Sequence, residues 1–478
     1  MAGSLQATPT YALQPSAQQV PLATNYITNF DFLNQYLPDT YEKEFERYGN
    51  RTISSFLRMV GAEIPSNSDL VKWAEQGRLH IKYTNVGIDI ADGATSDTAT
   101  LQVNDAGVPA FGTDNDIALR TGQTIMVIQN DGSGSNKAIV TSVDLPNNQF
   151  DVAFYEADGL VTAGAGFGAA QVTVFIYGSE FQKGTAGMQG SLEADDEIFE
   201  NSPIILKDKY AVNGSDMAQI GWVEVTTENG ATGYLWYLKS EHETRLRFED
   251  YLETSMIEAV PAEAASGAIA AGLKGTDGIF YSVENRGNVW SGGNPSSLAE
   301  FDTIISRLDK QGAIEENVIF LDRDFGFDID DMLAAQNSYG VGGTSYGLFD
   351  NDENMALNLG FTGFRRGYDF YKSDWKYLND PTMRGGLPTA AGSGKVNGLL
   401  VPAGTTTVYD QVLGKNAKRP FLHIRYRASQ TEDRKMKTWI TGSAGGAATS
   451  DLDAMEVNFL SERCVCTMGA NNFFLFEQ

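Results

Sequence analysis

A serine flanked by glycines is the first pattern in this chain that suggests chemistry. Gly343, Ser345 and Gly347 match the G-x-S-x-G spacing of serine hydrolases. In those enzymes the serine occupies a tight turn between a buried strand and a helix, and an acid and a histidine complete the triad. Here the preceding NSYGVG does not predict a buried strand, and His423 is the single downstream histidine, within the strand-like FLHIRYR. We therefore interpret the pattern as a glycine-rich loop, with a hydrolase using Ser345 as an alternative.

A second glycine-rich segment, Gly392-Ser393-Gly394-Lys395, is similar to the end of a phosphate-binding loop. That motif requires a glycine five residues before its second glycine and a serine or threonine after its lysine. Thr389 and Val396 occupy those positions. The segment predicts a loop without nucleotide binding, and no cofactor is expected.

An acidic cluster offers oxygen ligands of the kind that Mg²⁺ and Ca²⁺ prefer. Its members are Asp322, Asp324, Asp328, Asp330 and Asp331. Their spacing lacks the central glycine and the terminal glutamate of an EF-hand. We expect a solvated acidic face, with Asp328 as a helix cap, and no dedicated metal site. Adventitious binding of a divalent cation is the alternative.

The two cysteines, Cys464 and Cys466, lie two residues apart in a strand-like segment. Side chains at this spacing point to the same face of a strand, so both are expected to pack as small apolar groups. A structural zinc site normally needs four ligands, and the chain has only three histidines, His80, His242 and His423. This cysteine usage suits a reducing cytoplasm.

Charge and composition limit the function classes. The chain has 62 acidic against 35 basic residues, a net charge of −27, and 42% hydrophobic residues. The hydrophobic content supports folded domains, and 478 residues exceed the size of a single core. Fifty glycines indicate many turns and hence a strand-rich protein. The negative surface repels nucleic acid on average, which argues against a protein that grips DNA or RNA tightly.

Targeting and membrane signals are not expected. The N-terminal MAGSLQATPTYALQPSAQQVPLA is polar and has no apolar h-region. No apolar run approaches the length of a transmembrane helix. We therefore expect a soluble protein without a signal peptide.

The sequence at the start of the chain predicts an extended N-terminal arm that is followed by a short helix. Residues 1–60 begin as a polar arm that has too little apolar content to fold alone. The segment SNSDLVKWAEQG predicts a short helix, with Ser66 or Ser68 as its N-cap and Gly77 as its end.

Residues 81–177 change character and predict a small β-domain. Short runs rich in Val, Ile, Thr and aromatic residues alternate with NDGSGS, PNN and GAGFG turn clusters. The six runs are IKYTNVGIDI, TATLQV, IALRTGQTIMVIQ, KAIVTSVDL, QFDVAFYEA and QVTVFIYG. The fourth and fifth predict a hairpin around Pro146-Asn147-Asn148. Six strands over this length indicate an inserted barrel or sandwich.

A long amphipathic helix is predicted over residues 240–260. Ser240 and Glu243 form an S-x-x-E capping box, and Pro261 ends the pattern. Six residues fall at helical spacing on one face: Phe248, Tyr251, Leu252, Ser255, Met256 and Ala259. At 1.5 Å per residue the helix spans about 30 Å, which suits an extended support.

Residues 273–420 predict a mixed α/β unit. Asn294-Pro295 opens a helix that ends at Gly312, the strand NVIFLD follows, and Asp328 caps a second helix, DIDDMLAAQN. FTGFRRGYDFYKS and GLLVPAGTTTVYD predict further strands. Residues 421–478 predict strands again.

Several segments carry a resemblance to a known family. They are GSEFQKGT, KDKYAVNGSDMAQIGWVEV, the 240–260 helix, VNFLSERC and the final FFLF. In their amino-acid sequence and their order along the chain, these segments resemble the major capsid proteins of tailed bacteriophages, and most of all those of crAss-like phages. The resemblance covers most of the chain and implies an α+β Hong Kong 97-like fold, which has an N-arm, an E-loop, a P domain with a long spine helix, and an A domain.

The resemblance implies five parts. They are an N-arm at 1–60, an E-loop region at 61–239 with the β-rich insertion at 81–177, a spine helix at 240–272, an A domain at 273–420, and returning P- and A-domain strands at 421–478. It also implies a non-enzymatic protein that forms hexamers and pentamers of an icosahedral head around double-stranded DNA. Expected partners are further copies, portal and auxiliary or decoration proteins, and weakly bound DNA, but no membrane. Assembly is expected in the host cytoplasm, and the product is the virion.

Candidate contacts between copies follow from charge. The basic residues are Arg365, Arg366, Lys372, Arg384, Arg425 and Arg427, and the acidic ones include Glu193, Asp195 and Asp196. Two interpretations stay open: the basic side chains neutralise carboxylates within one chain, or they meet acidic patches on neighbouring copies. Lys183 lies in the expected E-loop region, but no cross-linking role is assigned to it.

One structural alternative also stays open. A phage tail or baseplate protein with a β-rich insertion would share much of this organisation, but it would form rings or tubes rather than closed shells.

Overall fold

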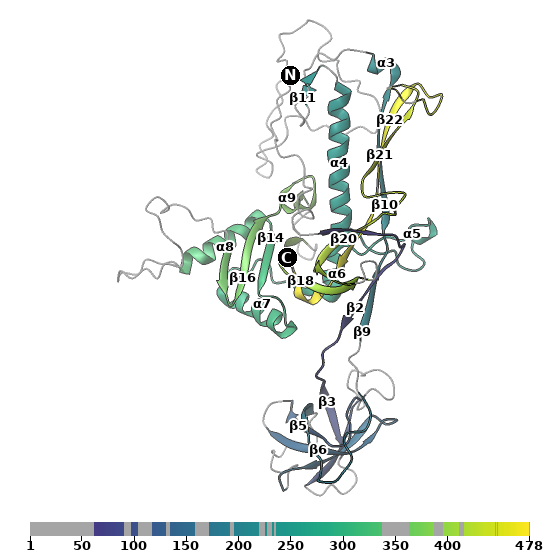
Figure 1. Ribbon diagram of the computed structural model, residues 1–478. Coiled ribbons are helices and arrows are strands. Elements are labelled where there is room, and N and C mark those ends of the chain that lie inside the picture. The colour runs from purple at the N-terminus through teal and green to yellow at the C-terminus, as the bar shows by residue number, and fades with distance from the viewer. Residues whose placement is uncertain are drawn as a thin grey trace, which may run out of the picture. The chain divides into compact units, whose positions relative to one another are not determined.

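The computed structural model describes residues 62–89, 97–103, 117–130, 134–157, 172–191, 196–218, 225–226, 232–233, 236–336, 363–386, 395–410, 415–444, 446 and 448–477 (Figure 1). The chain divides into two compact units, one made of residues 74–199 and the other of the residues before and after them. The fold is mixed α/β with mostly strands, and each unit has its own core.

The 74–199 unit is built on a closed barrel. Its six strands are β3 (Lys82–Asp89), β4 (Thr98–Gln102), β5 (Gln123–Gln129), β6 (Ser135–Asp144), β7 (Gln149–Phe154) and β8 (Val172–Ser179), closed in the order β3-β4-β7-β6-β5-β8. Alternate residues such as Val127, Val152 and Val174 point inward and are fully buried. The β6–β7 hairpin turns at Asn148, whose positive φ of 51° suits asparagine. The six predicted strands and the hairpin are confirmed.

The other unit contains a six-stranded mixed sheet that is covered on both faces. Its order is β13 (Asn288–Trp290), β23 (Phe474–Glu477), β17 (Val396–Pro402), β14 (Glu316–Leu321), β16 (Tyr368–Asp374) and β15 (Gly363–Arg366). Leu399 and Leu475 face one core cluster, whereas the neighbouring Leu400 and Phe474 face another. The central strands β14, β17 and β23 are rich in apolar residues, as expected for strands that are buried on both faces.

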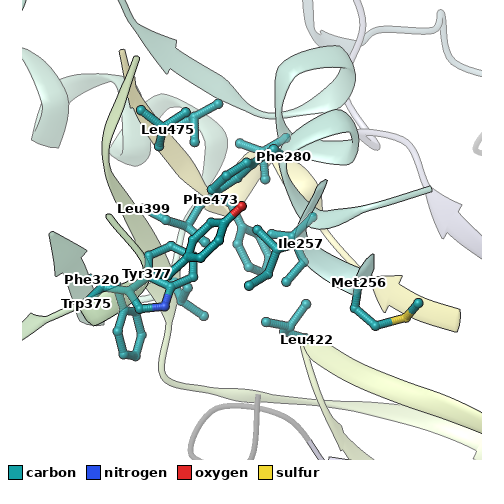
Figure 2. Close-up of a cluster of buried hydrophobic side chains, with 14 of the residues drawn as sticks. Met256, Ile257, Phe280, Phe320, Trp375, Tyr377, Leu399, Leu422, Phe473 and Leu475 are labelled. Carbon is teal, nitrogen blue, oxygen red and sulfur yellow. The ribbon is translucent and has the colours of Figure 1, made fainter. Parts of the chain in front are cut away.

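Helices cover each face of this sheet. Helices α7 (Leu298–Gln311) and α8 (Arg323–Gln336) pack on one face through Phe301, Ile304 and Phe325. The opposite face meets α6 (Ile279–Arg286), α9 (Lys376–Asn379) and the end of a long helix, α4 (Trp236–Glu258). In that cluster, Met256 and Ile257 of α4 lie with Phe280, Trp375 and Leu422 (Figure 2).

A five-stranded sheet runs beside α4 (Figure 1). Its members are β1 (Ala62–Ser66), β20 (Leu422–Arg427), β22 (Ala454–Thr467), β10 (Ile204–Asn213) and β21 (Lys437–Gly442). The long β22 pairs with β10 along one edge and with β20 and β21 in succession along the other. Phe248 and Leu252 of α4 pack against Val457 and Phe459 of β22. The predicted apolar face of the long helix is confirmed for Phe248, Leu252 and Met256, which are buried, but not for Tyr251, which is 45% exposed.

The remaining elements are short. Helix α3 is Gly214–Met217, α5 is Gly267–Ala270, and the 3₁₀ turns η3 and η4 are Arg384–Gly386 and Ala470–Asn472. Three two-stranded ribbons pair β2 (Val71–Gln76) with β9 (Asp196–Asn201), β11 (Val225–Thr226) with β12 (Thr232–Gly233), and β18 (Thr405–Asp410) with β19 (Lys415–Pro420). No helix in the described ranges is both long and apolar enough to cross a bilayer.

Two predictions about helices in the first half of the chain are wrong: one predicted helix is a strand, and the long helix begins earlier than expected. SNSDLVKWAEQG contains the strand β2 rather than a helix, since its backbone pairs with β9, more than a hundred residues later. The ion pair Lys72–Glu200, at 2.8 Å, supports this pairing. The long helix begins at Trp236, so Ser240 lies inside it: the Ser240 carbonyl accepts a bond from Thr244 Oγ1 at 2.9 Å.

Two helix caps in the second half also differ from the prediction. Helix α7 is capped by Ser297, which forms a capping box with Glu300, rather than opened at Asn294-Pro295. Its predicted end at Gly312 is confirmed, with a left-handed φ of 69°. Helix α8 begins at Arg323, so Asp328 lies within it and Asp322 takes the capping position.

Candidate functional site

Three carboxylates of the acidic cluster at α8, Asp322, Asp328 and Asp330, make contacts within the chain. Asp322 accepts a bond from the Phe325 N–H at 2.8 Å and pairs with Lys395 at 3.3 Å. Burial is the main cause that raises the pKa of the Asp322 carboxyl. Asp330 pairs with Lys372, and Asp328 accepts a bond from Asn294 at 2.7 Å. Across the described residues, no group of three or more His, Cys, Asp or Glu is placed to hold a metal ion.

Cys464 and Cys466 are free, buried thiols on β22. They form a small cluster with Val71 and with the partly buried Trp73 of β2. The neighbouring Cys464 and burial raise the pKa of the Cys466 thiol well above its ordinary value, so it stays protonated and unreactive. Packing of both cysteines on one strand face is confirmed.

The two glycine-rich motifs cannot be placed as sites. Ser345 and its flanking glycines lie outside the described residues, as do Gly392 to Gly394. Lys395, the end of the second motif, is described and pairs with Asp322. His423, the histidine available to a hydrolase, is buried on β20, and its Nδ1 lies 3.2 Å from the Pro420 carbonyl oxygen.

Most of the candidate basic residues form ion pairs within the chain. Arg365 pairs with Asp369 at 3.1 Å, and Arg366 forms a two-point contact with Asp302. Lys372 pairs with Asp330, and Arg384 pairs with Glu258 and lies over the Phe280 ring. Arg427 contacts Asp69 and Glu462. Arg425 lies on β20 opposite Cys464.

These pairs agree with the within-chain interpretation of the basic residues. Contacts between copies stay a prediction. Lys183 and Asp196 are exposed in the 74–199 unit, whereas Glu193 and Asp195 lie outside the described residues.

An apolar loop after α4 is the most distinctive exposed feature of the described chain. We call residues 259–278 the 259–278 loop; it contains α5 and leads into α6. Every residue from 263 to 274 except Ser266 is exposed. Its larger apolar side chains, Ile269 and Leu273, are 46% and 63% exposed, and Val260 at its start is 56% exposed. From 264 to 273 the loop has no charged residue.

The base of the 259–278 loop is held closed. The Gly278 N–H donates to the Ala259 carbonyl at 2.8 Å, and the Ala262 N–H donates to the Lys274 carbonyl at 2.9 Å. Gly275 has a φ of 69°, and a Cβ there would lie 2.4 Å from the Val260 carbonyl oxygen, so only glycine fits.

A buried asparagine anchors the same base. The Asn201 side-chain amide donates to the Val465 carbonyl at 2.7 Å and to the Asp277 carbonyl at 3.0 Å. Its oxygen accepts bonds from Thr276 Oγ1 and the Asp277 N–H. The loop is therefore fixed to β22, although Ile269 and Leu273 at its tip stay exposed.

Sequence reasoning did not single out the 259–278 loop. Its run of alanine and glycine shows no periodic spacing that would indicate a helix or a strand, and Pro261 indicates only the end of a helix. The signal that could have found it is the uncharged stretch with Ile269 and Leu273 in so acidic a chain.

Comparisons with known proteins were made by family, sequence and structure. No model of a known family matches the chain, and no curated protein matches it in sequence. A chain from Microbacterium phage Oxtober96 is similar over 93% of this chain and 96% of its own, with 9% identity and a TM-score of 0.38. A chain from the capsid of a native GTA particle is similar over 95% and 99%, with 8% identity and a TM-score of 0.37.

A third similar structure is the asymmetric unit of the bacteriophage PhiM1 mature capsid. It covers 63% of this chain and 78% of its own, with 10% identity and a TM-score of 0.32. Structural neighbours of this chain thus include capsid proteins, which are structural components rather than enzymes.

Proposed function

We propose that this chain is the major capsid protein of a tailed bacteriophage, of the crAss-like type and with a Hong Kong 97-like fold. Copies associate into hexamers and pentamers that close into an icosahedral head around double-stranded DNA. The resemblance of the segments at 178–185, 207–225 and 457–464 supports this assignment, together with the long helix α4 beside the five-stranded sheet.

The 259–278 loop is the observation that carries the proposal. A loop with a fixed base and an uncharged, apolar, exposed tip is costly to a protein that works alone, because such surface favours association. Two copies that each carry a charge of −27 repel one another, so contact is easiest where the surface is uncharged. The loop offers a contact of this kind to a neighbouring copy.

The charge distribution supports a container rather than a protein that grips DNA. Lys209, Lys372 and Arg384 are examples of cations that are paired with carboxylates of the same chain. An acidic inner surface that has no continuous row of Lys and Arg side chains binds DNA phosphates weakly. Packaged DNA can then slide along this surface.

A double substitution, Ile269→Glu with Leu273→Glu, tests the role of the loop. Charges at these two positions would face the acidic surface of a neighbour, so we expect loss of shells and capsomers with the subunit still folded. Sedimentation velocity measures the assembly, and circular dichroism of the dissociated subunit measures folding.

Leu145→Glu is the matched control, because Leu145 is 42% exposed on the barrel and lies outside the loop. It should assemble like the unsubstituted protein. Normal assembly of the double variant would show that the loop is not part of the interface between copies. The main support for the proposal would then be lost.

A further inference from the structure

A shallow groove lies on the barrel of the 74–199 unit, with a volume of about 560 Å³. It is formed where β5, β6 and β8 meet the end of β7. The side chains that could recognise a ligand there are Asn136, Lys137, Tyr155, Glu156, Tyr177 and Glu180. Neither the proposed shell nor the barrel core needs this particular set.

Two tyrosines present their rings at the groove. Tyr155 is 49% exposed and Tyr177 is 48% exposed, although both sit beside well-buried barrel strands. Tyrosine in such a place supplies a rigid apolar face together with a polar tip.

A β-bulge directs Tyr177 to this place. Thr124 of β5 is opposite Gly178 and the next residue, Ile125, is opposite Ile176, so Tyr177 is an extra residue without a partner on β5. Bulges of this type re-aim one side chain and occur often beside binding sites. The Lys137 Nζ lies 5.7 Å from the centre of the Tyr177 ring.

Hydrogen bonding orients the second ring. The Tyr155 hydroxyl donates to Glu180 Oε2 at 2.6 Å. The Glu180 and Glu156 carboxylates and the Lys137 ammonium line the groove beside the two rings. Carboxylates accept bonds from hydroxyl groups, and an ammonium donates to hydroxyl oxygens.

This combination matches one ligand class. The C–H face of a sugar ring packs on an aromatic face, and its hydroxyls bond to charged and amide side chains at the rim. A nucleotide base could also stack on tyrosine, but Glu156 and Glu180 outnumber Lys137 and repel the attached phosphate. The same repulsion disfavours acidic polysaccharides.

We propose that the groove of the 74–199 unit binds a neutral oligosaccharide. Small barrels of other proteins also bind oligosaccharides on their strand faces. Such a site would let the protein bind glycans on a cell surface. This inference does not depend on whether the chain forms a shell.

The test is a microarray of neutral glycans probed with the full-length chain, followed by titration calorimetry with the bound glycans. Maltohexaose, cellohexaose, laminarihexaose and mannohexaose are the defined probes, and a heparin fragment and a 20-residue oligothymidine are the anionic comparators. We expect binding of at least one neutral glycan and of neither anion.

Substitutions tie that binding to the groove. Tyr155→Ala and Tyr177→Ala should each weaken it by about tenfold, the effect of losing one stacked ring, while Tyr177→Phe keeps the ring and most of the affinity. Tyr371→Ala is the control, since Tyr371 is 54% exposed outside the barrel. Circular dichroism confirms that each variant is folded.

Three results would overturn the inference. One is no binding of any neutral glycan on the array. Another is binding that the two alanine variants leave unchanged. The third is binding of heparin or oligothymidine through the same tyrosines, which would assign the groove to an anionic polymer.

Discussion

His423 shows how a residue that suggests chemistry can serve the core instead. It lies on β20 with 5% of its surface exposed. Burial first, and then the charge of Arg425, lower its pKa to about 4. A histidine that is neutral at physiological pH because it is desolvated is suited to packing. On the neighbouring strand, the hydrogen bond with Cys464 and then burial raise the pKa of the Cys466 thiol.

The pH dependence of unfolding tests this view of His423. An unfolded histidine titrates near 6.5, so between about pH 6.5 and 4 the unfolded chain binds a proton that the folded chain does not. The contribution of neutral His423 to the free energy of unfolding is complete above pH 6.5 and is lost as the pH falls toward 4. Between pH 7 and 4.5 the protein should lose about 2 kcal/mol of unfolding free energy more than His423→Gln does.

Urea unfolding of the dissociated subunit measures this difference. His80→Gln is the control for a histidine substitution, because His80 is exposed. An identical pH dependence for His423→Gln would show that His423 titrates normally in the folded chain.

At the scale of elements, local signals located most strands but missed several helix ends. The barrel strands were predictable because alternation and turn residues lie within each segment. The strand β2 was not, since its partner β9 is distant in sequence and SNSDLVKWAEQG on its own satisfies a helix pattern. In α8 the glycine at 326 concealed the first turn, which Asp322 and the buried Phe325 nonetheless form.

Substitution of Asp322 tests its capping of α8. Asp322→Ala removes the acceptor for the Phe325 N–H and the partner of Lys395, and should cost about 2 kcal/mol of unfolding free energy. Asp322→Asn keeps an acceptor and avoids a buried charge, so its cost should stay within about 1 kcal/mol. Denaturant unfolding measures both values.

Asp324→Ala is the control for the acidic cluster, because Asp324 is exposed in the first turn of α8. Its effect should be within about 0.5 kcal/mol. Equal losses for Asp322→Ala and Asp324→Ala would mean that general charge, rather than the cap, matters there.

At the scale of the whole molecule, the surfaces were harder to predict than the cores. The basic residues Arg365, Arg366 and Arg384 attract attention in the sequence, yet their carboxylate partners became identifiable only in the fold. The 259–278 loop and the groove at Tyr155 and Tyr177 depend on which side chains stay uncovered, and burial is decided by contacts far apart in sequence. The resemblance of segments did not point to these surfaces.

Electron microscopy of the full-length protein, expressed alone and together with the products of neighbouring genes, tests the central proposal most directly. A shell protein should give closed icosahedral particles, or hexameric and pentameric capsomers, built from this chain. Rings or tubes without any shell would contradict the proposal and indicate a tail component. Monomers under every condition would likewise contradict self-assembly.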